Sequence, residues 1–254
     1  MNSPALSDTL LDLIRQQPGA EKAVAYLTQQ ADAYRNQPTT AVFYRVFTAI
    51  PRFVGKQPVS VSPDQAQQIH TLRNGFTVED WSLDRLARVW WLLQLPADDP
   101  AVYVSTIENL FKAAEMNELM ALYSAIPALQ FPEHWRFQAT EGVRSNMGPV
   151  QDALMLQNPY PAEQLDEPAW NQLIMKAFFC DKPVEEILGF EERTNETLAR
   201  IAVDYAQERR AAGRTIPPQL WTLVKPFVTD ANRAELEGLL RTHGVAGDPV
   251  QPTK

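Results

Sequence analysis

The sequence predicts an all-α protein, and three observations support this prediction. Apolar residues recur at the three- and four-residue spacing of an amphipathic helix along nearly the whole chain. The 254 residues include 10 glycines and 20 prolines, whereas β-rich folds depend on glycine in tight turns and proline suits helix ends. The one stretch that alternates in polarity, 58–62, is too short and too close to prolines to be a strand.

The expected helices begin and end at residues that favour helix boundaries. The first apolar stripe begins at Leu6 and is closed by Pro18, and the second begins at Val24 and ends before Pro38. A third helix at 40–50 is expected to stop at Pro51. Later helices are expected at 63–74, 83–95, 100–111, 115–126, 132–146, 149–156, 167–179, 183–188, 195–212, 217–228 and 230–243.

Several of these helices carry specific capping signals. Ser62 precedes a proline, which suits a capping residue followed by the first turn. Ser82 is expected to cap the helix at 83–95, which is apolar nearly all round and is therefore expected to be buried. Asp98 and Asp99 resemble the start of a D-D-x-x-D magnesium motif, but position 102 is Val. Asp99 is therefore interpreted as a helix cap.

Two helix ends resemble one another and predict a repeat architecture. Phe-Thr-Ala-Ile-Pro at 47–51 matches Tyr-Ser-Ala-Ile-Pro at 123–127, 76 positions later, and Leu-Gln-Leu-Pro at 93–96 is a weaker third copy. Two periods of about 38 residues fit this spacing, close to HEAT and armadillo repeats. The expected fold is a right-handed, HEAT/armadillo-like α-solenoid of about 13 helices in one domain, 1–243. An irregular helical bundle is the alternative, and a flexible tail is expected at 244–254.

Composition narrows the classes of partner and the compartment. The net charge of −8 argues against nucleic acid, because phosphate binding needs a cationic face. No run approaches 18 apolar residues, and the N-terminus lacks the pattern of a signal peptide, so no direct membrane insertion is expected. A single cysteine, Cys180, excludes an internal disulfide and indicates a reducing, cytoplasmic setting.

Motifs for catalysis, cofactors and metals are absent from the sequence. The chain has no phosphate loop, no G-x-G-x-x-G and no G-x-S-x-G nucleophile elbow. His70, His134 and His243 each stand alone, without other ligands at metal spacing. We therefore expect no cofactor, no metal site and no assigned catalytic residue.

One stretch, 141–179, is dense in polar residues, aromatics and prolines, and it holds most of the candidate ligand-binding residues. Neighbouring helices could bring these side chains around one polar pocket lined by a tryptophan, and an arginine near the end of the helix at 195–212 could clamp an anion. The candidates are Arg144, Asn146, Asn158, Tyr160, Trp170, Asn171, Lys176 and Arg209.

Each candidate also has a structural interpretation. Arg144 lies three residues after Glu141, as in a surface ion pair. Asn146 could end its helix in the left-handed conformation. The prolines after Asn158 and Tyr160 could hold both residues extended in a rigid helix stop. Arginine in the last turn of a helix is favoured by the helix dipole.

The same stretch carries a family resemblance. Glu-Gly-Val-Arg-Ser-Asn-Met at 141–147, Asn-Pro-Tyr-Pro-Ala at 158–162 and Ala-Trp-Asn-Gln-Leu-Ile-Met-Lys-Ala-Phe-Phe at 169–179 resemble the EboA family. So do 81–90, 208–214 and 217–227. The resemblance places a core at 81–228 after variable N-terminal helices at 1–75. It implies a bacterial protein encoded in a secondary-metabolite gene cluster beside a membrane prenyltransferase, and it implies no catalytic residues.

These observations favour a non-catalytic binding or scaffold protein in the biosynthesis or export of a secondary metabolite. Its partners would be other proteins of the same gene cluster or a small metabolite. The alternative is an enzyme that acts on a prenylated or phosphorylated pathway intermediate, with arginine and lysine side chains holding the anion.

Overall fold

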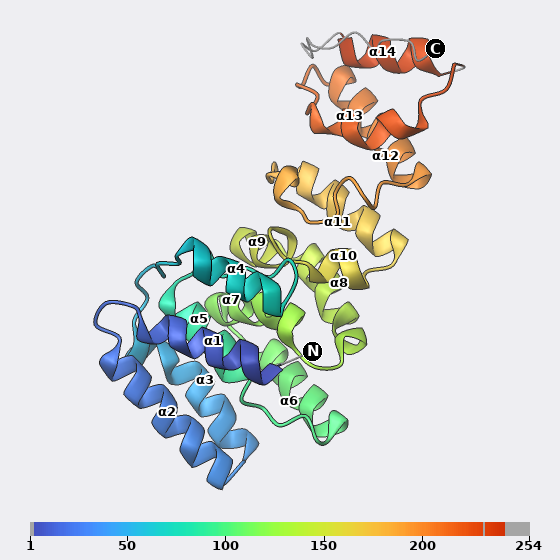
Figure 1. Ribbon diagram of the computed structural model, residues 1–254. Helices are drawn as coiled ribbons and strands as arrows, with labels where there is room; N and C mark the ends of the chain where they lie inside the picture. Colours follow the sequence, from blue (N-terminus) through green and yellow to red (C-terminus); the bar gives the residue numbers. More distant parts are fainter. Residues whose placement is uncertain (1–2, 231, 242–254) are drawn as a thin grey trace. The chain divides into compact units, whose positions relative to one another are not determined.

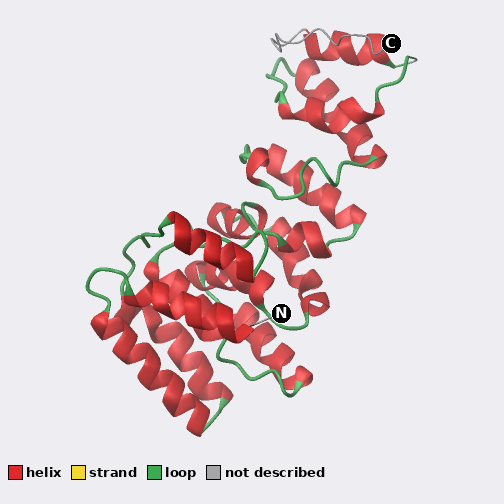
Figure 2. Ribbon diagram, in the orientation of Figure 1, coloured by secondary structure: helices red, strands yellow, loops and turns green. Residues whose placement is uncertain are grey.

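The computed structural model describes residues 3–230 and 232–241, and over these residues every regular element is a helix (Figures 1 and 2). The prediction of an all-α protein is confirmed. The α-helices are α1 (Ser3–Arg15), α2 (Glu21–Asn36), α3 (Thr40–Val54), α4 (Pro63–Leu72), α5 (Leu83–Leu92), α6 (Pro100–Ala113), α7 (Met116–Ala125), α8 (Arg136–Arg144), α9 (Gly148–Met155), α10 (Tyr160–Gln164), α11 (Glu167–Phe179), α12 (Glu196–Ala211), α13 (Gln219–Val224) and α14 (Arg233–Arg241).

Short 3₁₀ turns supplement these helices. They are η1 (Ile126–Ala128), η2 (Pro132–Trp135), η3 (Val184–Glu186) and η4 (Lys225–Phe227). The helices expected at 132–146, 183–188 and 217–228 are therefore shorter than predicted or partly 3₁₀.

The described residues form two compact units. The first takes the chain up to Ala169 together with Glu186–Leu188, and the second takes Trp170–Glu185 and the chain from Gly189 onward. A single domain at 1–243, with its variable part at 1–75 and core at 81–228, stays a prediction. The expected flexible tail at 244–254 lies outside the described residues.

Helix α5 is the centre of the first unit and packs against α1, α2, α3 and α7 (Figure 1). Every residue of α5 except Arg85 is buried, which confirms the expectation that this helix is enclosed. Trp91 is fully buried, and its indole Nε1 donates a hydrogen bond to Phe43 O at 3.1 Å. Two of the buried residues, Asp84 and Arg88, are charged and form an ion pair at 3.0 Å.

Helices α3, α5, α7 and α9 pack against one another in succession. Such a row of alternate helices occurs in one layer of a helical-repeat protein. The right-handed solenoid stays a prediction, as does the bundle alternative.

The prediction that Pro51 stops its helix is wrong, because α3 continues to Val54 with Pro51 inside it. A proline in a helix leaves the carbonyl four residues earlier without its amide donor. For Pro51 that carbonyl is Phe47 O, which accepts a hydrogen bond from Arg88 Nε at 3.2 Å. A buried side chain of α5 therefore replaces the missing amide.

In the second copy of the repeat, a side chain likewise donates to the carbonyl four residues before the proline. Pro127 lies in η1, directly after α7, and the carbonyl four residues earlier is Tyr123 O. Tyr123 O accepts a hydrogen bond from Asn158 Nδ2 at 3.1 Å. In both copies, a side chain distant in sequence satisfies the carbonyl that proline leaves free.

The predicted caps have mixed outcomes. Ser62 forms a capping box with Gln65, and Asp99 Oδ1 accepts hydrogen bonds from the amides of Ala101 and Val102, so both predictions are confirmed. The prediction that the Ser82 side chain caps α5 is wrong, because its hydroxyl donates to Asp84 Oδ1 at 2.6 Å and accepts no hydrogen bond from an amide of the first turn. Helix α5 also ends before residue 95, because the amides of 93–95 bond to carbonyls three residues earlier.

The second unit has its own small core. Trp170, Leu173, Ile174 and Phe178 of α11 are buried, and Phe178 contacts the ring of Tyr205 on α12. Helix α12 packs against α13 and α14. Asn195 caps α12 by accepting a hydrogen bond from Leu198 N at 2.8 Å.

Candidate ligand-binding site

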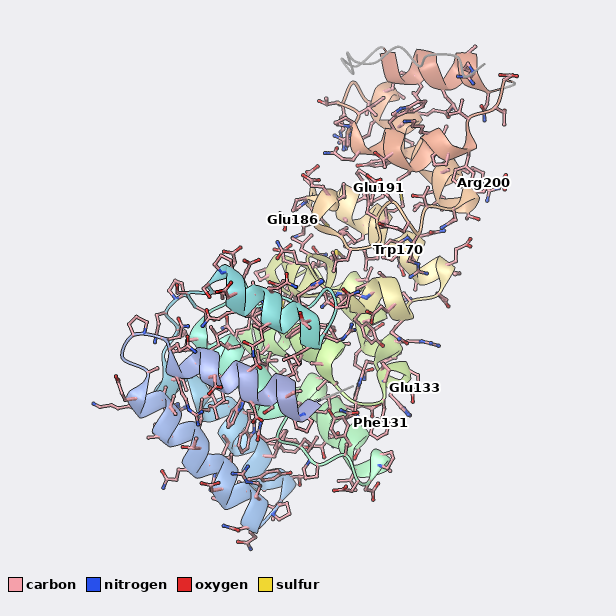
Figure 3. All side chains as sticks on the ribbon, viewed as in Figure 1. Phe131, Glu133, Trp170, Glu186, Glu191 and Arg200 are labelled. Carbon is pink, nitrogen blue, oxygen red and sulfur yellow. The ribbon has the colours of Figure 1, made fainter. Side chains whose placement is uncertain are left out.

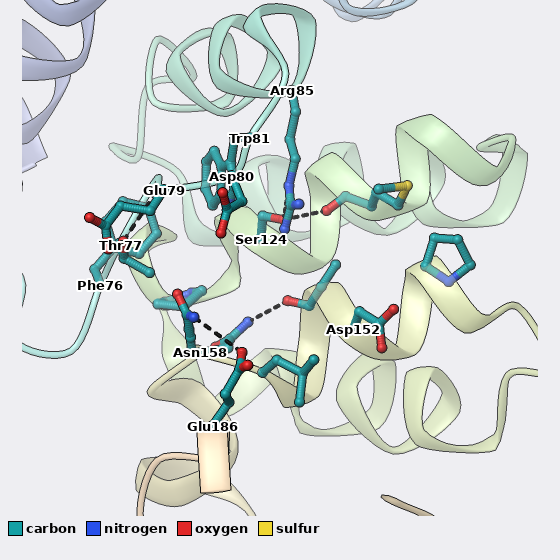
Figure 4. Close-up of a pocket in the computed structure, with 16 residues that line it drawn as sticks. Phe76, Thr77, Glu79, Asp80, Trp81, Arg85, Ser124, Asp152, Asn158 and Glu186 are labelled. Atoms are coloured by element: carbon teal, nitrogen blue, oxygen red, sulfur yellow. Dashed lines mark hydrogen bonds between the residues drawn. The ribbon is translucent and has the colours of Figure 1, made fainter. Parts of the chain in front are cut away.

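A cavity of about 200 Å³ lies in the first unit, between the segment before α5 and the helices α5, α7 and α9 (Figure 4). The segment 76–81 forms one wall, and α9 with the turn that follows it forms another. The lining residues are Phe76, Thr77, Glu79, Asp80, Trp81, Arg85, Met120, Ser124, Pro127, Pro149, Asp152, Ala153, Leu156, Gln157, Asn158 and Glu186.

The backbone around the cavity is held in unusual conformations. Asp80 and Gln157 both line it, with φ angles of 58° and 50°, a region that residues other than glycine seldom occupy. Gly75, at φ 73°, begins the wall, and a Cβ there would meet Leu188 Cδ1 at 3.0 Å and Pro159 Cβ at 3.1 Å. The wall therefore starts from a close backbone approach that requires glycine.

Arg85 is fixed in this cavity by two contacts (Figure 4). Its Nε donates a hydrogen bond to Ser124 Oγ at 2.7 Å, and its guanidinium carbon lies 4.5 Å from the centre of the Trp81 ring. Ser124 Oγ in turn donates to Met120 O at 2.5 Å. Neither terminal nitrogen of Arg85 has a hydrogen-bond partner among the residues that the structure describes.

Burial lowers the pKa of Arg85 to about 10, and attraction to Asp152 and Asp84 partly offsets that effect. A base with this pKa is still protonated in all but about one molecule in a thousand at pH 7. The cavity therefore contains a guanidinium cation with donors to spare.

Carboxylates surround this cation. Glu79, Asp80 and Glu186 line the cavity with exposed side chains, whereas Asp152 is half-buried. Glu186 Oε2 accepts a hydrogen bond from Gln157 Nε2 at 3.1 Å, which links η3 to the turn after α9. Four carboxyl groups and one guanidinium thus line a space that is small and polar.

Asn158 is the predicted site residue that lines this cavity. Its Nδ2 donates to Tyr123 O at 3.1 Å and to Ala153 O at 2.9 Å, and its Oδ1 accepts from Tyr160 N at 3.0 Å. The side chain is buried and its hydrogen bonds join α7, α9 and α10. Asn158 therefore shapes the wall of the cavity.

Tyr160 is buried in the same unit, and its hydroxyl donates to Pro132 O at 2.6 Å. Burial raises the pKa of Tyr160 above the ordinary value for a phenol. The expectation of an extended Tyr160 is wrong, because this residue begins α10 with Pro161 in the first turn. The bond from Tyr160 N to Asn158 stabilises that helix start.

Arg144 and Asn146 are both exposed. Arg144 pairs with Glu141 at 2.8 Å, as the structural interpretation proposed. The prediction that Asn146 ends its helix in the left-handed conformation is wrong, because the φ angle of Asn146 is not positive. The chain leaves α8 through Ser145, at φ −54° and ψ 146°. Ser145 O accepts a hydrogen bond from Gln151 Nε2 at 2.7 Å, and this bond closes the turn.

The other four predicted residues lie in the second unit (Figure 3 labels Trp170). Trp170 is fully buried under the guanidinium of Arg193 at 4.7 Å, and its Nε1 has no hydrogen-bond partner among the described residues. Asn171 exchanges hydrogen bonds with Asn195 at 3.2 and 2.8 Å. Lys176 is half-buried.

Arg209 donates to Tyr205 Oη at 2.9 Å and to Thr215 O at 2.5 Å, so its contacts hold the end of α12 to the following loop. The eight predicted residues therefore divide equally between the two units. Their convergence on one pocket stays a prediction.

Sequence reasoning missed Arg85, Ser124 and Asp152 as residues of one cavity. Arg85 interrupts a helix that is otherwise apolar nearly all round, and Ser124 lies in the second copy of the repeat. Both signals were present in the sequence. Only the packing of α5, α7 and α9 brings them to Asp152.

The described part of the chain has neither a membrane-spanning helix nor a metal-binding cluster. None of its helices combines the length and apolar character needed to cross a bilayer. Within the same residues, histidine, cysteine and acidic side chains nowhere gather in threes closely enough to hold a metal ion.

Over the described residues, the fold and the cavity together define an all-helical protein with a small cavity lined by charged side chains. The chain belongs to the EboA family: the family model described as metabolite traffic protein EboA matches residues 6–225. This match confirms the resemblance found in the sequence motifs, and it spans the cavity-lining residues. Comparisons with curated proteins and with solved structures give no match.

Proposed function

We propose that this protein is a non-catalytic binding protein for a small polar metabolite, and that the cavity around Arg85 holds the ligand. The main supporting observation is the half-buried guanidinium of Arg85, which lines a cavity of the family-matched region and whose terminal nitrogens have no hydrogen-bond partner in the described chain. Both nitrogens can therefore donate hydrogen bonds to a ligand that displaces water from the cavity. The family's description as a metabolite traffic protein supports the same role.

The contacts of the polar groups favour binding over turnover. Ser124 Oγ accepts from Arg85 and donates to a backbone carbonyl, so no base is placed to remove its proton. His70 lines a neighbouring hollow of about 530 Å³, and its Nδ1 accepts a hydrogen bond from Gly75 N at 3.2 Å. Nucleophilic catalysis needs a nucleophile in contact with a base, and neither group provides that pair.

The charged lining favours a small polar metabolite over a prenylated one. The cavity of about 200 Å³ has room for such a compound. A hydrocarbon chain placed there would take water from the carboxylates without replacing its hydrogen bonds. In the proposed role, the protein carries its ligand in the cytoplasm to other proteins encoded by the same gene cluster.

Equilibrium dialysis tests this function. The purified protein is dialysed against a small-molecule extract of its host, and retained compounds are identified by mass spectrometry. Retention is expected for the natural chain and for Ala101→Leu, an exposed control on α6. The cavity-lining variant Ala153→Leu is expected to lose it, because three added carbon atoms fill the space. Equal retention by both variants would place the ligand elsewhere, and no retention by the natural chain would refute the proposed function.

A further inference from the structure

The orientation of Arg85 specifies the kind of group that it can bind. Its Nε is bonded to Ser124, and one face of its guanidinium lies against Trp81. These contacts fix the plane of the guanidinium while leaving both terminal nitrogens as donors. A planar pair of parallel N–H groups matches the two oxygens of a carboxylate, which such a fork binds bidentately.

The surrounding charges limit the charge of the ligand. Glu79, Asp80, Asp152 and Glu186 outnumber the single guanidinium, so each negative charge on a ligand adds repulsion, and a dianion such as phosphate meets about twice as much as a monoanion. A ligand with one negative charge can place that charge against Arg85 and keep the rest of the molecule neutral or positive beside the carboxylates. The cavity therefore favours a monoanion over a phosphorylated compound.

The same carboxylates call for hydrogen-bond donors on the rest of the ligand. An ionised carboxylate only accepts hydrogen bonds and has about four lone-pair positions. Glu186 uses one of its oxygens for Gln157, and Glu79 Oε2 accepts from Thr77 Oγ1 at 3.5 Å, so both carboxylates can accept further hydrogen bonds. Hydroxyl or ammonium groups on a ligand would donate those bonds.

We infer that the cavity takes a small monocarboxylate that also bears a hydroxyl or amino group. The carboxylate lies against the terminal nitrogens of Arg85, and the donor groups face Glu79, Asp80 and Glu186. This inference rests on the proposed function and adds the ligand class to it. The cavity of about 200 Å³ has room for compounds the size of a hydroxy acid or a small amino acid.

Isothermal titration calorimetry with four probes tests the inference. Glycerate and L-serine carry both required features, ethanolamine lacks the carboxylate, and inorganic phosphate replaces it with a more highly charged anion. Binding is expected for glycerate or L-serine, at least tenfold tighter than for ethanolamine or phosphate. Whichever of the two binds more tightly shows whether the donor groups are hydroxyls alone or include an ammonium.

Two variants connect binding to the guanidinium. Arg85→Gln is expected to weaken binding about 10- to 100-fold, the range for losing hydrogen bonds to a charged group. Arg85→Lys keeps the charge but loses the fork and is expected to weaken binding less. Arg52→Gln, an exposed arginine outside the cavity, is the matched control and should bind as the natural chain does. Circular dichroism establishes that each variant is folded.

The outcomes separate the inference from the function on which it rests. Tighter binding of phosphate or ethanolamine, no binding of any probe at millimolar concentration, or unchanged affinity in Arg85→Gln would each overturn the ligand class. In those cases, retention of another host compound that Ala153→Leu abolishes would leave the proposed function intact. Failure of the dialysis experiment itself would overturn both.

Discussion

Replacing Arg88 by methionine is expected to destabilise the first unit more than any other single change in α5. The Arg88 side chain is 3% exposed, lies 3.0 Å from Asp84 and 3.9 Å from Glu118, and donates to Phe47 O at 3.2 Å. Methionine conserves volume but leaves two buried carboxylates without their cation and one carbonyl without its donor. Breaking a buried ion pair costs about 3–5 kcal/mol.

Arg85→Met is the matched control, one turn earlier on the same helix. Arg85 is only half-buried and makes one hydrogen bond, to an uncharged hydroxyl, and one ring contact, so its loss should cost about 1–2 kcal/mol. Urea unfolding followed by circular dichroism gives both free energies of unfolding. If Arg88→Met costs no more than Arg85→Met, the buried charges do not hold α5 in place.

A second substitution tests the role assigned to Phe47 O. Pro51→Ala restores an amide that can donate to this carbonyl, so in the Arg88→Met background it should recover about 1 kcal/mol. In the natural chain, where Arg88 already occupies the carbonyl, the same substitution should recover less. Equal effects in the two backgrounds would mean that Arg88 and Pro51 are not coupled.

Three further predictions concern packing, the cavity wall and pH. Gly142→Ala should destabilise by about 1–3 kcal/mol because the new Cβ would lie 2.7 Å from Tyr123 Cε1 and 2.8 Å from Leu154 Cδ2. Gly238→Ala, whose new Cβ would meet no atom of the described residues outside its own helix backbone within 4 Å, should not destabilise in the same urea titration. Asn158→Ala should cost about 2–3 kcal/mol by thermal unfolding, since it leaves Tyr123 O and Ala153 O unpaired. Burial raises the pKa of Tyr103 and of Tyr123 to about 12. The folded state therefore holds the phenol protons of these two tyrosines more tightly than the unfolded state does. Their contribution to the free energy of unfolding is complete below pH 10 and should be lost between pH 10 and 12. Tyrosinate absorbance should show fewer phenols ionising near pH 10 in the folded protein than in urea, and identical titrations would contradict this assignment.

Local signals in the sequence predicted the helical class and many boundaries. The expected bounds of α11 agree with the structure, and the predicted caps at Ser62 and Asp99 formed because each acts on amides two or three residues away. The enclosure of α5 followed from its apolar residues on all sides. Each of these features depends on neighbours in the sequence.

The errors arose where a distant side chain replaced a local interaction. Pro51 does not stop α3 because Arg88, 37 positions later in the chain, supplies the missing donor. Ser82 does not cap α5 because Asp84 accepts its hydroxyl. The cavity was missed for the same reason, since α5, α7 and α9 contribute one polar residue each and no short motif contains them.

The central claim is that the cavity around Arg85 is a ligand site, and a crystal structure of the protein bound to its retained host compound tests it most directly. We expect electron density for a carboxylate within about 3 Å of the terminal nitrogens of Arg85, with the rest of the compound among the carboxylates of the cavity. Density for the compound elsewhere, with this cavity unchanged, would show that the cavity is not the ligand site.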